Sequence, residues 1–273
     1  MAYPILDHEL ARRVELAEAG SAVACAELLA RLRPDSAAAV EPIAGGYAVF
    51  CGINSPITQA VAIGLAGTVS AEEIARLEEF YFSRGDAVRV EMCPLADPSV
   101  FAHFGERGYR VTEFSSVMAR PLSSSEHWPD PTGGLTVEQA APEQAGQWAQ
   151  IVAQGFAEEF PVTPELLDVM SMFASAPGVL PFFARLEGEI AGGGCLSLRG
   201  GVAGLFGAST LPAFRKRGVQ TALLQARLAR GASAGCSLAV SLAQPASISE
   251  HNILRQGFAT LYTRVKFEKP LPG

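Results

Sequence analysis

Three consecutive basic residues and a glycine give the clearest chemical signal in the chain. They are Arg215, Lys216, Arg217 and Gly218, within the segment STLPAFRKRGVQT at 209–221. Guanidinium and ammonium groups attract anions, and glycine lets the backbone approach a ligand closely. This combination favours the binding of a phosphate or pyrophosphate group. The alternative interpretation is a basic turn that precedes an ordinary helix.

The secondary structure on either side of this segment determines whether it could bind an anion. An apolar run over 202–208 predicts a strand, and a helical pattern over 219–229 predicts a helix. The first N–H groups of a helix have no partner inside the helix and carry a partial positive charge, so they favour anions. A strand, a basic glycine loop and a helix start therefore form a candidate pyrophosphate site.

The loop resembles the acetyl-CoA signature of the GCN5-related N-acetyltransferase (GNAT) superfamily. That signature is Gln or Arg, two residues, Gly, one residue, then Gly or Ala. Arg215 and Gly218 match it, whereas Gln220 stands where Gly or Ala is usual. The segment NILRQGF at 252–258 resembles the family's later Asn…Gly-Phe segment. The resemblance covers roughly residues 134–270 and implies an α/β fold with a mixed sheet and acetyl-CoA as co-substrate.

The resemblance also implies which residues hold the co-substrate. Main-chain groups at the strand end would bond the pantetheine arm, N–H groups of the loop and helix start would hold the pyrophosphate, and two residues of a short helix would orient CoA. The residues implied for the pantetheine arm are Thr210 and Leu211, and those implied for orienting CoA are Ser249 and Asn252. The residues implied for the pyrophosphate are Arg215, Lys216, Arg217, Gly218, Val219, Gln220 and Thr221.

The proton chemistry of acetyl transfer is less clearly marked. The attacking ammonium must lose a proton, and the leaving thiolate must be neutralised. Many family members carry a tyrosine four residues before the glycine of Gly-Phe, but here that residue is Ile253. Tyr262 is the candidate catalytic acid. A water held near the thiol is the alternative route, and packing of a strand tyrosine on the sheet is the alternative role for Tyr262.

The acceptor is expected to be a primary amine on a small molecule or a peptide. Glu158 and Glu159 lie where the family places its acceptor pocket, and an acidic pair there would attract an amine; a solvated loop is the alternative. Two other functions remain open. Ile253 suggests a CoA-binding sensor or scaffold with weakened catalysis, and the site would also suit an acyltransferase that uses another acyl-CoA.

Composition limits the partners and the compartment. The chain has 273 residues and a net charge of −7 at pH 7, which argues against nucleic acid as a partner because phosphate binding needs a basic footprint. Five cysteines form no C-x-x-C pair, so no metal site is expected. No secretory signal or stretch of membrane-spanning length is visible. We therefore expect a cytoplasmic protein without a membrane partner. A homodimer is the oligomeric state that we consider for it.

An internal repeat divides the chain into two halves. The segments GY at 108–109 and RPL at 120–122 correspond to GF at 257–258 and KPL at 269–271, with the same spacing in each half. Between the halves, PLSSSEHWPDPTGG at 121–134 is rich in serine, proline and glycine, which is typical of a linker. We therefore expect two tandem GNAT-like domains.

The first predicted domain differs from the second at the position of the basic loop. There, Ser70 and Glu73 have the spacing of a capping box, and Glu72 adds a second negative charge at the helix start. Negative charge at that place opposes a phosphate. We expect residues 1–122 to form a degenerate domain without a CoA site, 123–134 a linker and 135–273 the acetyltransferase domain.

Local patterns predict three further features in the second half. Thr163 followed by Pro164 predicts the start of a helix. Glu187-Gly188 predicts a tight hairpin turn. The three glycines at 192–194 interrupt a predicted strand, which indicates a bulge or a close approach of another backbone.

The contrast between the two predicted domains gives a first test. We predict that the chain binds a single CoA, because only the second domain combines a basic loop with a helix start that is free of acidic residues. Isothermal titration calorimetry measures the stoichiometry directly. A value near two CoA per chain would contradict the prediction.

Overall fold

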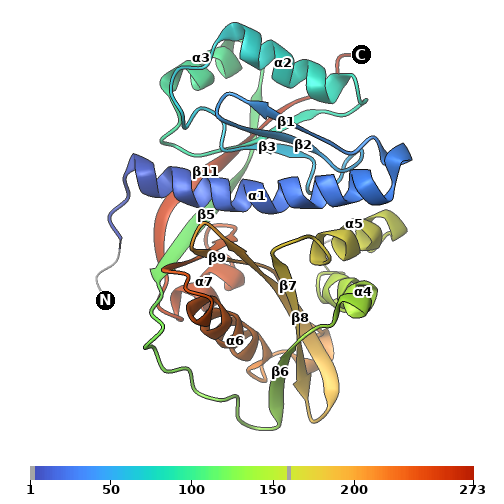
Figure 1. The fold of residues 1–273 in the computed structure, drawn as a ribbon, viewed down its shortest axis with the longest axis vertical. Coiled ribbons are helices and arrows are strands. Elements are labelled where there is room, and N and C mark those ends of the chain that lie inside the picture. The colour runs from blue at the N-terminus through green and yellow to red at the C-terminus, as the bar shows by residue number, and fades with distance from the viewer. Residues whose placement is uncertain (1–3, 159–160) are drawn as a thin grey trace. The chain divides into compact units, whose positions relative to one another are not determined.

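The computed structural model describes residues 4–158 and 161–273, so Glu159 lies outside the described residues. These residues form a mixed α/β protein, as the sequence predicts (Figure 1). The chain divides into two compact units. We call them the C-terminal unit, mainly residues 119–242 and 252–259, and the N-terminal unit, residues 5–118, 243–251 and 260–273.

The C-terminal unit is a sheet with helices on both faces (Figure 1). Its strands are β6 (Leu135–Gln139), β7 (Val179–Leu186), β8 (Glu189–Arg199), β9 (Val202–Thr210) and β10 (Leu238–Ala243). They lie in the order β10-β9-β8-β7-β6, with β9 and β10 parallel and the other neighbours antiparallel. Helix α6 (Val219–Ser233) covers one face, and α4 (Ala145–Gly155) and α5 (Pro164–Ala174) lie on the other.

The strands of the N-terminal unit lie in the order β1-β2-β3-β4-β11-β5. Its strands are β1 (Ala39–Ile43), β2 (Gly46–Phe50), β3 (Gln59–Val61), β4 (Val88–Met92), β5 (Arg110–Pro121) and β11 (Ala259–Lys269). The long helix α1 (His8–Leu32) lies on one face, and α2 (Ala71–Phe82) and α3 (Pro98–Glu106) lie on the other (Figure 1). Helix α7 (Ile248–Leu254) precedes β11, and one-turn 3₁₀ helices occupy Pro34–Ser36, Pro142–Gln144 and Pro212–Phe214.

Several local predictions are confirmed by the hydrogen bonds at helix starts and by the backbone angles of a hairpin turn. Ser70 Oγ accepts from the N–H of Glu73 at 3.2 Å, and the Glu73 carboxylate accepts from the N–H of Ser70 at 2.9 Å, which completes the capping box of α2. Thr163 Oγ1 accepts from the N–H of Leu166 at 3.2 Å and so caps α5. Glu187 and Gly188 both have positive φ, at 54° and 89°, as the predicted two-residue hairpin requires.

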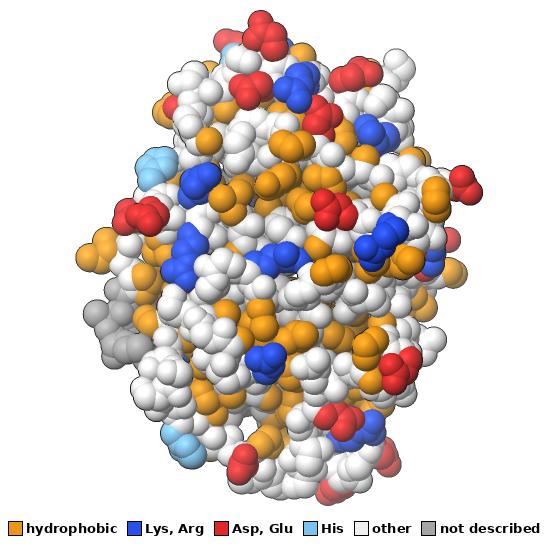
Figure 2. Space-filling model, in the orientation of Figure 1, with side chains coloured by type: hydrophobic (Ala, Val, Ile, Leu, Met, Phe, Trp, Pro, Cys, Tyr) orange, Lys and Arg blue, Asp and Glu red, His pale blue; other side chains and the backbone are white. Residues whose placement is uncertain are grey.

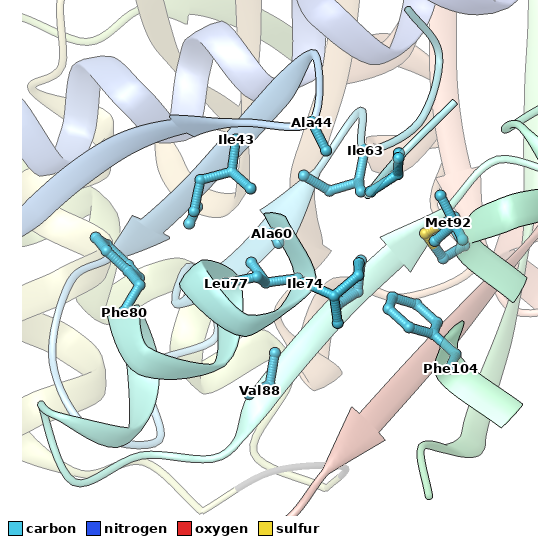
Figure 3. Close-up of a cluster of buried hydrophobic side chains, with 14 of the residues drawn as sticks. Ile43, Ala44, Ala60, Ile63, Ile74, Leu77, Phe80, Val88, Met92 and Phe104 are labelled. Atoms are coloured by element: carbon cyan, nitrogen blue, oxygen red, sulfur yellow. The ribbon is translucent and has the colours of Figure 1, made fainter. Parts of the chain in front are cut away.

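The core of the N-terminal unit is built from helix positions three and four residues apart. Ile74 and Leu77 of α2 are fully buried and gather with Ala60 of β3 and Val88 of β4 in the cluster that Figure 3 shows. The ring of Phe104 from α3 stacks on Tyr109 with centroids 4.1 Å apart. Fully burying side chains of this size contributes about 1.5–3 kcal/mol each.

Strand β11 comes from the end of the chain but completes the N-terminal unit. It pairs antiparallel with β4, from Val265 opposite Met92 to Lys269 opposite Val88. The ring of Phe267 lies 5.2 Å from that of Phe104 and so joins the same core. Strand β11 belongs to the second half of the sequence, but it contributes one strand and one core side chain to a unit that consists mostly of the first half.

An ionic network joins β11 to α1 inside this unit. Arg264 is buried, and its Nη2 lies 3.0 Å from Glu15 Oε2 and 2.7 Å from Glu18 Oε2. The Tyr262 hydroxyl donates to Glu15 Oε1 at 2.7 Å. Burial raises the pKa of Glu15, against the effect of Arg264. Burial alone would lower the pKa of Arg264, but the two carboxylates raise it well above its usual value.

The surface carries charges of both signs (Figure 2). Figure 2 shows Lys and Arg side chains interspersed with Asp and Glu over the face that it presents. Within residues 4–158 and 161–273, no helix is long and apolar enough to cross a membrane. Among the same residues, no group of three or more His, Cys, Asp or Glu side chains is placed to hold a metal ion.

The buried network predicts a large effect from one substitution. Arg264→Met should lower the free energy of unfolding by about 3–5 kcal/mol, because it leaves Glu15 buried without its cation. The matched control is Arg76→Met, which removes the exposed pair with Glu41 at 2.6 Å. That change should cost less than about 1 kcal/mol. Urea unfolding measures both values, and equal losses would contradict the assignment.

Candidate functional site

The basic loop lies where the sequence predicts it, between β9 and α6. Strand β9 ends at Thr210, the turn Pro212–Phe214 follows, and α6 begins at Val219 directly after Gly218. Gly218 has φ 82° and Lys216 has φ 62°, so two left-handed residues shape the loop. Backbone that alternates in this way turns successive N–H groups toward a common point, which suits an anion.

The start of α6 differs from the start of α2 in its capping. No side chain in the described part of the chain caps α6, because its N-cap residue is Gly218. The N–H groups of Val219, Gln220 and Thr221 are therefore left to another partner. At α2, by contrast, Ser70 and Glu73 form a capping box. The predicted difference between the two helix starts is thus present in their hydrogen bonds.

The three basic side chains of the loop are exposed and differ in their partners. Arg215 donates to Glu158 Oε2 at 2.7 Å and to the carbonyl of Gly155 at 3.2 Å. Arg217 lies 3.5 Å from Glu187 Oε1. Lys216 has no ion pair among the residues that the structure describes. Exposed pairs of this kind are worth at most about 1 kcal/mol, so a phosphate can take over either arginine at little cost.

The end of β9 offers main-chain groups beside the loop. The parallel register of β9 with β10 ends at Leu205 opposite Ser241, while β9 itself continues to Thr210. Main-chain groups beyond that point are available on this side to pair with an extended ligand. Leu211 is a weaker candidate than Thr210, because its N–H donates to Ala191 at 2.9 Å and its carbonyl accepts from Phe214 at 2.9 Å.

The structure brings together two of the predicted cofactor-binding side chains. Asn252 Nδ2 of α7 donates to Gln220 Oε1 of α6 at 2.7 Å. Gln220 is the departure from the family signature, so its side chain points to Asn252 rather than into open solvent. Ser249 is exposed on α7, and Ile253 is buried.

Tyr262 lies in the N-terminal unit, within the ionic network described above. It is 6% exposed, and burial together with the Glu15 carboxylate raises the pKa of its hydroxyl. That hydroxyl already donates to Glu15. These contacts favour the interpretation of Tyr262 as a packed strand tyrosine over its role as the catalytic acid.

Comparisons with known proteins agree with this arrangement. Residues 147–258 match the family model described as Acetyltransferase (GNAT) family. A GCN5-related N-acetyltransferase from Kribbella flavida aligns over 93% of this chain and 96% of its own, with a TM-score of 0.64 and 15% identity. A tandem GNAT protein from the clavulanic acid biosynthesis pathway aligns over the same shares, 93% and 96%, with a TM-score of 0.59 and 13% identity.

A third structure, a GCN5-related N-acetyltransferase from Sphaerobacter thermophilus, aligns over 74% of this chain and 68% of its own, with a TM-score of 0.57 and 18% identity. The comparison with curated proteins gives no match. At these identities the structural likenesses establish the fold. Residues 147–258 thus match the GNAT family model, and the chain has the tandem GNAT fold that the sequence predicts.

The position of Tyr262 generates a prediction about its hydroxyl. Tyr262→Phe should lower the turnover of acyl transfer by less than about tenfold, because the leaving thiolate is neutralised by another route. The same change should lower the free energy of unfolding by about 1–3 kcal/mol, since buried Glu15 loses a donor.

Steady-state kinetics and urea unfolding separate the two effects, and Tyr47→Phe in the half-buried β2 position is the control. A hundredfold or larger loss of turnover with intact CoA affinity would instead make Tyr262 the acid.

Proposed function

We propose that the protein is an acetyl-CoA-dependent N-acetyltransferase, with one acetyl-CoA bound by the C-terminal unit and a primary amine of a small molecule or peptide as acceptor. The observation that carries the proposal is the uncapped start of α6 behind Gly218, next to three exposed cationic side chains. Residues 1–122 then act as the domain without a CoA site, 123–134 as the linker and 135–273 as the acetyltransferase domain.

Within this proposal the residues of the loop have distinct tasks. The N–H groups of Val219, Gln220 and Thr221 receive the pyrophosphate, and Lys216 supplies a cation that has no ion pair among the described residues. Arg215 and Arg217 exchange exposed carboxylates for phosphate oxygens. These groups fit the co-substrate because a dianion satisfies several N–H donors and cations at once.

The acyl end of the co-substrate needs a different set of groups. Main-chain atoms near Thr210 hold the pantetheine arm, and Asn252, fixed by Gln220, orients it from α7, on which Ser249 also lies. The amine attacks the thioester carbonyl and loses its proton, while the thiolate leaves and takes one up. With Ile253 at the usual tyrosine position, we assign the proton at the sulfur to a water.

Glu158 supports an amine as the acceptor, because it lies in the turn after α4, pairs with Arg215 of the loop and has a side chain that is 66% exposed. Glu158 and a phosphate would compete for Arg215. If Arg215 binds the phosphate, the Glu158 carboxylate can bind a cationic amine instead. The cytoplasmic location and the homodimer stay predictions.

Two other functions are separated by simple measurements. A CoA-binding sensor would bind CoA but acetylate none of a panel of amines, and the buried Ile253 favours this alternative. An enzyme for a different acyl group would give products whose masses match the other acyl-CoA when several are offered together.

The site assignment is tested by adding a charge at the helix start. Gly218→Asp should weaken CoA binding by at least about 100-fold, because a carboxylate at that place opposes the pyrophosphate. Gly235→Asp is the matched control: Gly235 follows the other end of α6, has φ 81° against 82° for Gly218, and has open space around it. Both variants carry the same charge and the same backbone strain.

Isothermal titration calorimetry gives the affinities, and circular dichroism checks that both variants are folded. Unchanged CoA affinity in Gly218→Asp, or an equal loss in Gly235→Asp, would contradict the site.

A further inference from the structure

Arg227 of α6 is a buried cation without a carboxylate partner. It is 2% exposed, and the ion pairs formed by the residues that the structure describes do not include it. Its Nε donates to the carbonyl of Leu223 at 3.0 Å. Its Nη1 donates to the carbonyls of Cys195 at 2.8 Å and Phe206 at 3.3 Å. Burial lowers the pKa of Arg227 to about 10, so the side chain still carries its charge at neutral pH.

A charge in this position costs free energy that an apolar residue would not. Val219, Leu223 and Arg227 are spaced four residues apart, on the buried side of the helix. A buried charge is retained at a cost unless hydrogen bonds or a specific role offset it. The carbonyls that accept from Arg227 indicate what that role is.

The two strand carbonyls flank a bulge between β8 and β9. Gly193 lies opposite Ser209, and the next register pair is Cys195 opposite Phe206. Gly194 therefore faces two residues of β9, and one of them, Gly207, has φ 56°. Arg227 bonds both members of the pair that closes the bulge, Cys195 and Phe206, through a single nitrogen.

The same bulge begins where β9 leaves β10. The last register pair between those strands is Leu205 and Ser241, and the Ser241 hydroxyl donates to the Leu205 carbonyl at 3.0 Å. From Phe206 to Thr210, β9 has no register partner on β10 among the described residues. Arg227 thus holds the strand at the residue where its edge becomes available.

We propose that Arg227 is a positioning residue that fixes the β9 bulge and so presents residues 206–210 as the edge on which an extended acyl-pantetheine arm pairs. This inference rests on the proposed function, because it takes the arm of CoA as the ligand. Arg227 contacts neither the pyrophosphate loop nor the amine in this scheme. Its loss therefore affects the arm and leaves the phosphates bound.

The test compares CoA with adenosine 3′-phosphate 5′-diphosphate, which is CoA without its pantetheine arm. Calorimetry on the full chain gives the two dissociation constants. The constant of the armless ligand divided by that of CoA measures how much the arm strengthens binding. In Arg227→Met the ratio should fall at least about tenfold, while the affinity for the armless ligand changes less than about threefold, because only the preorganised edge is lost.

A second variant reaches the same guanidinium from the strand side. A Cβ at Gly194 would meet the Arg227 Nη1 at 2.9 Å, so Gly194→Ala should displace the side chain and reduce the ratio. In the double variant, Gly194→Ala should cause no further decrease in the ratio beyond that of Arg227→Met. Two independent losses of stability would instead add together. Gly204→Ala is the control, because its Cβ meets the Ser197 hydroxyl at 2.5 Å instead.

Each outcome decides between the hypotheses. A wild-type ratio in folded Arg227→Met, or an equal loss for both ligands, would overturn the inference while the CoA site stands. If Arg227→Met does not fold, the ratio in Gly194→Ala decides. If the wild-type chain binds neither ligand, the proposed function fails and this inference fails with it.

Discussion

The N–H groups at the start of a helix have to find acceptors, and this constraint separates the two units. In α2, Ser70 Oγ accepts from the N–H of Glu73 and the Glu73 carboxylate accepts from the N–H of Ser70, so this helix start has a side-chain cap. In α6 the preceding residue is Gly218, which has no side chain to offer. The same local element is therefore closed in one unit and open in the other, and the chemistry of the chain follows the open one.

The C-terminal unit reaches its site geometry through close contacts that only glycine allows. A Cβ at Gly192 would lie 2.4 Å from the carbonyl oxygen of Ser209, and one at Gly155 would lie 2.2 Å from the Ser209 hydroxyl. The glycine run at 192–194 is thus a close backbone approach and a bulge, as its interruption of the strand predicts. Helix α4, strand β8 and strand β9 meet at Ser209, one residue before the end of β9, so small residues there set the path of the strand toward the loop.

Features that depend on neighbouring residues were predictable from the sequence, and features that depend on distant ones were not. The capping box at Ser70, the cap at Thr163 and the position of the loop at Gly218 each follow from short patterns. The bond between Gln220 and Asn252, and that between Tyr262 and Glu15, join residues far apart in the chain, and no local pattern specifies them. For Arg227 the sequence contains one indication, a charged residue on an apolar helix face. Its carbonyl partners could not be predicted, because they depend on the register of β8 and β9.

The contribution of β11 to the N-terminal unit has a consequence for synthesis on the ribosome. Arg264 and Glu15 are 249 residues apart in the chain, and the sheet of this unit also needs β11 beside β4. Contacts of such separation form late, because the intervening chain must first be made and then closed. The first half of the nascent chain therefore has an unfinished sheet, with an unpaired strand edge at β4, until β11 leaves the exit tunnel. During that interval we expect chaperones to bind the exposed strand edge.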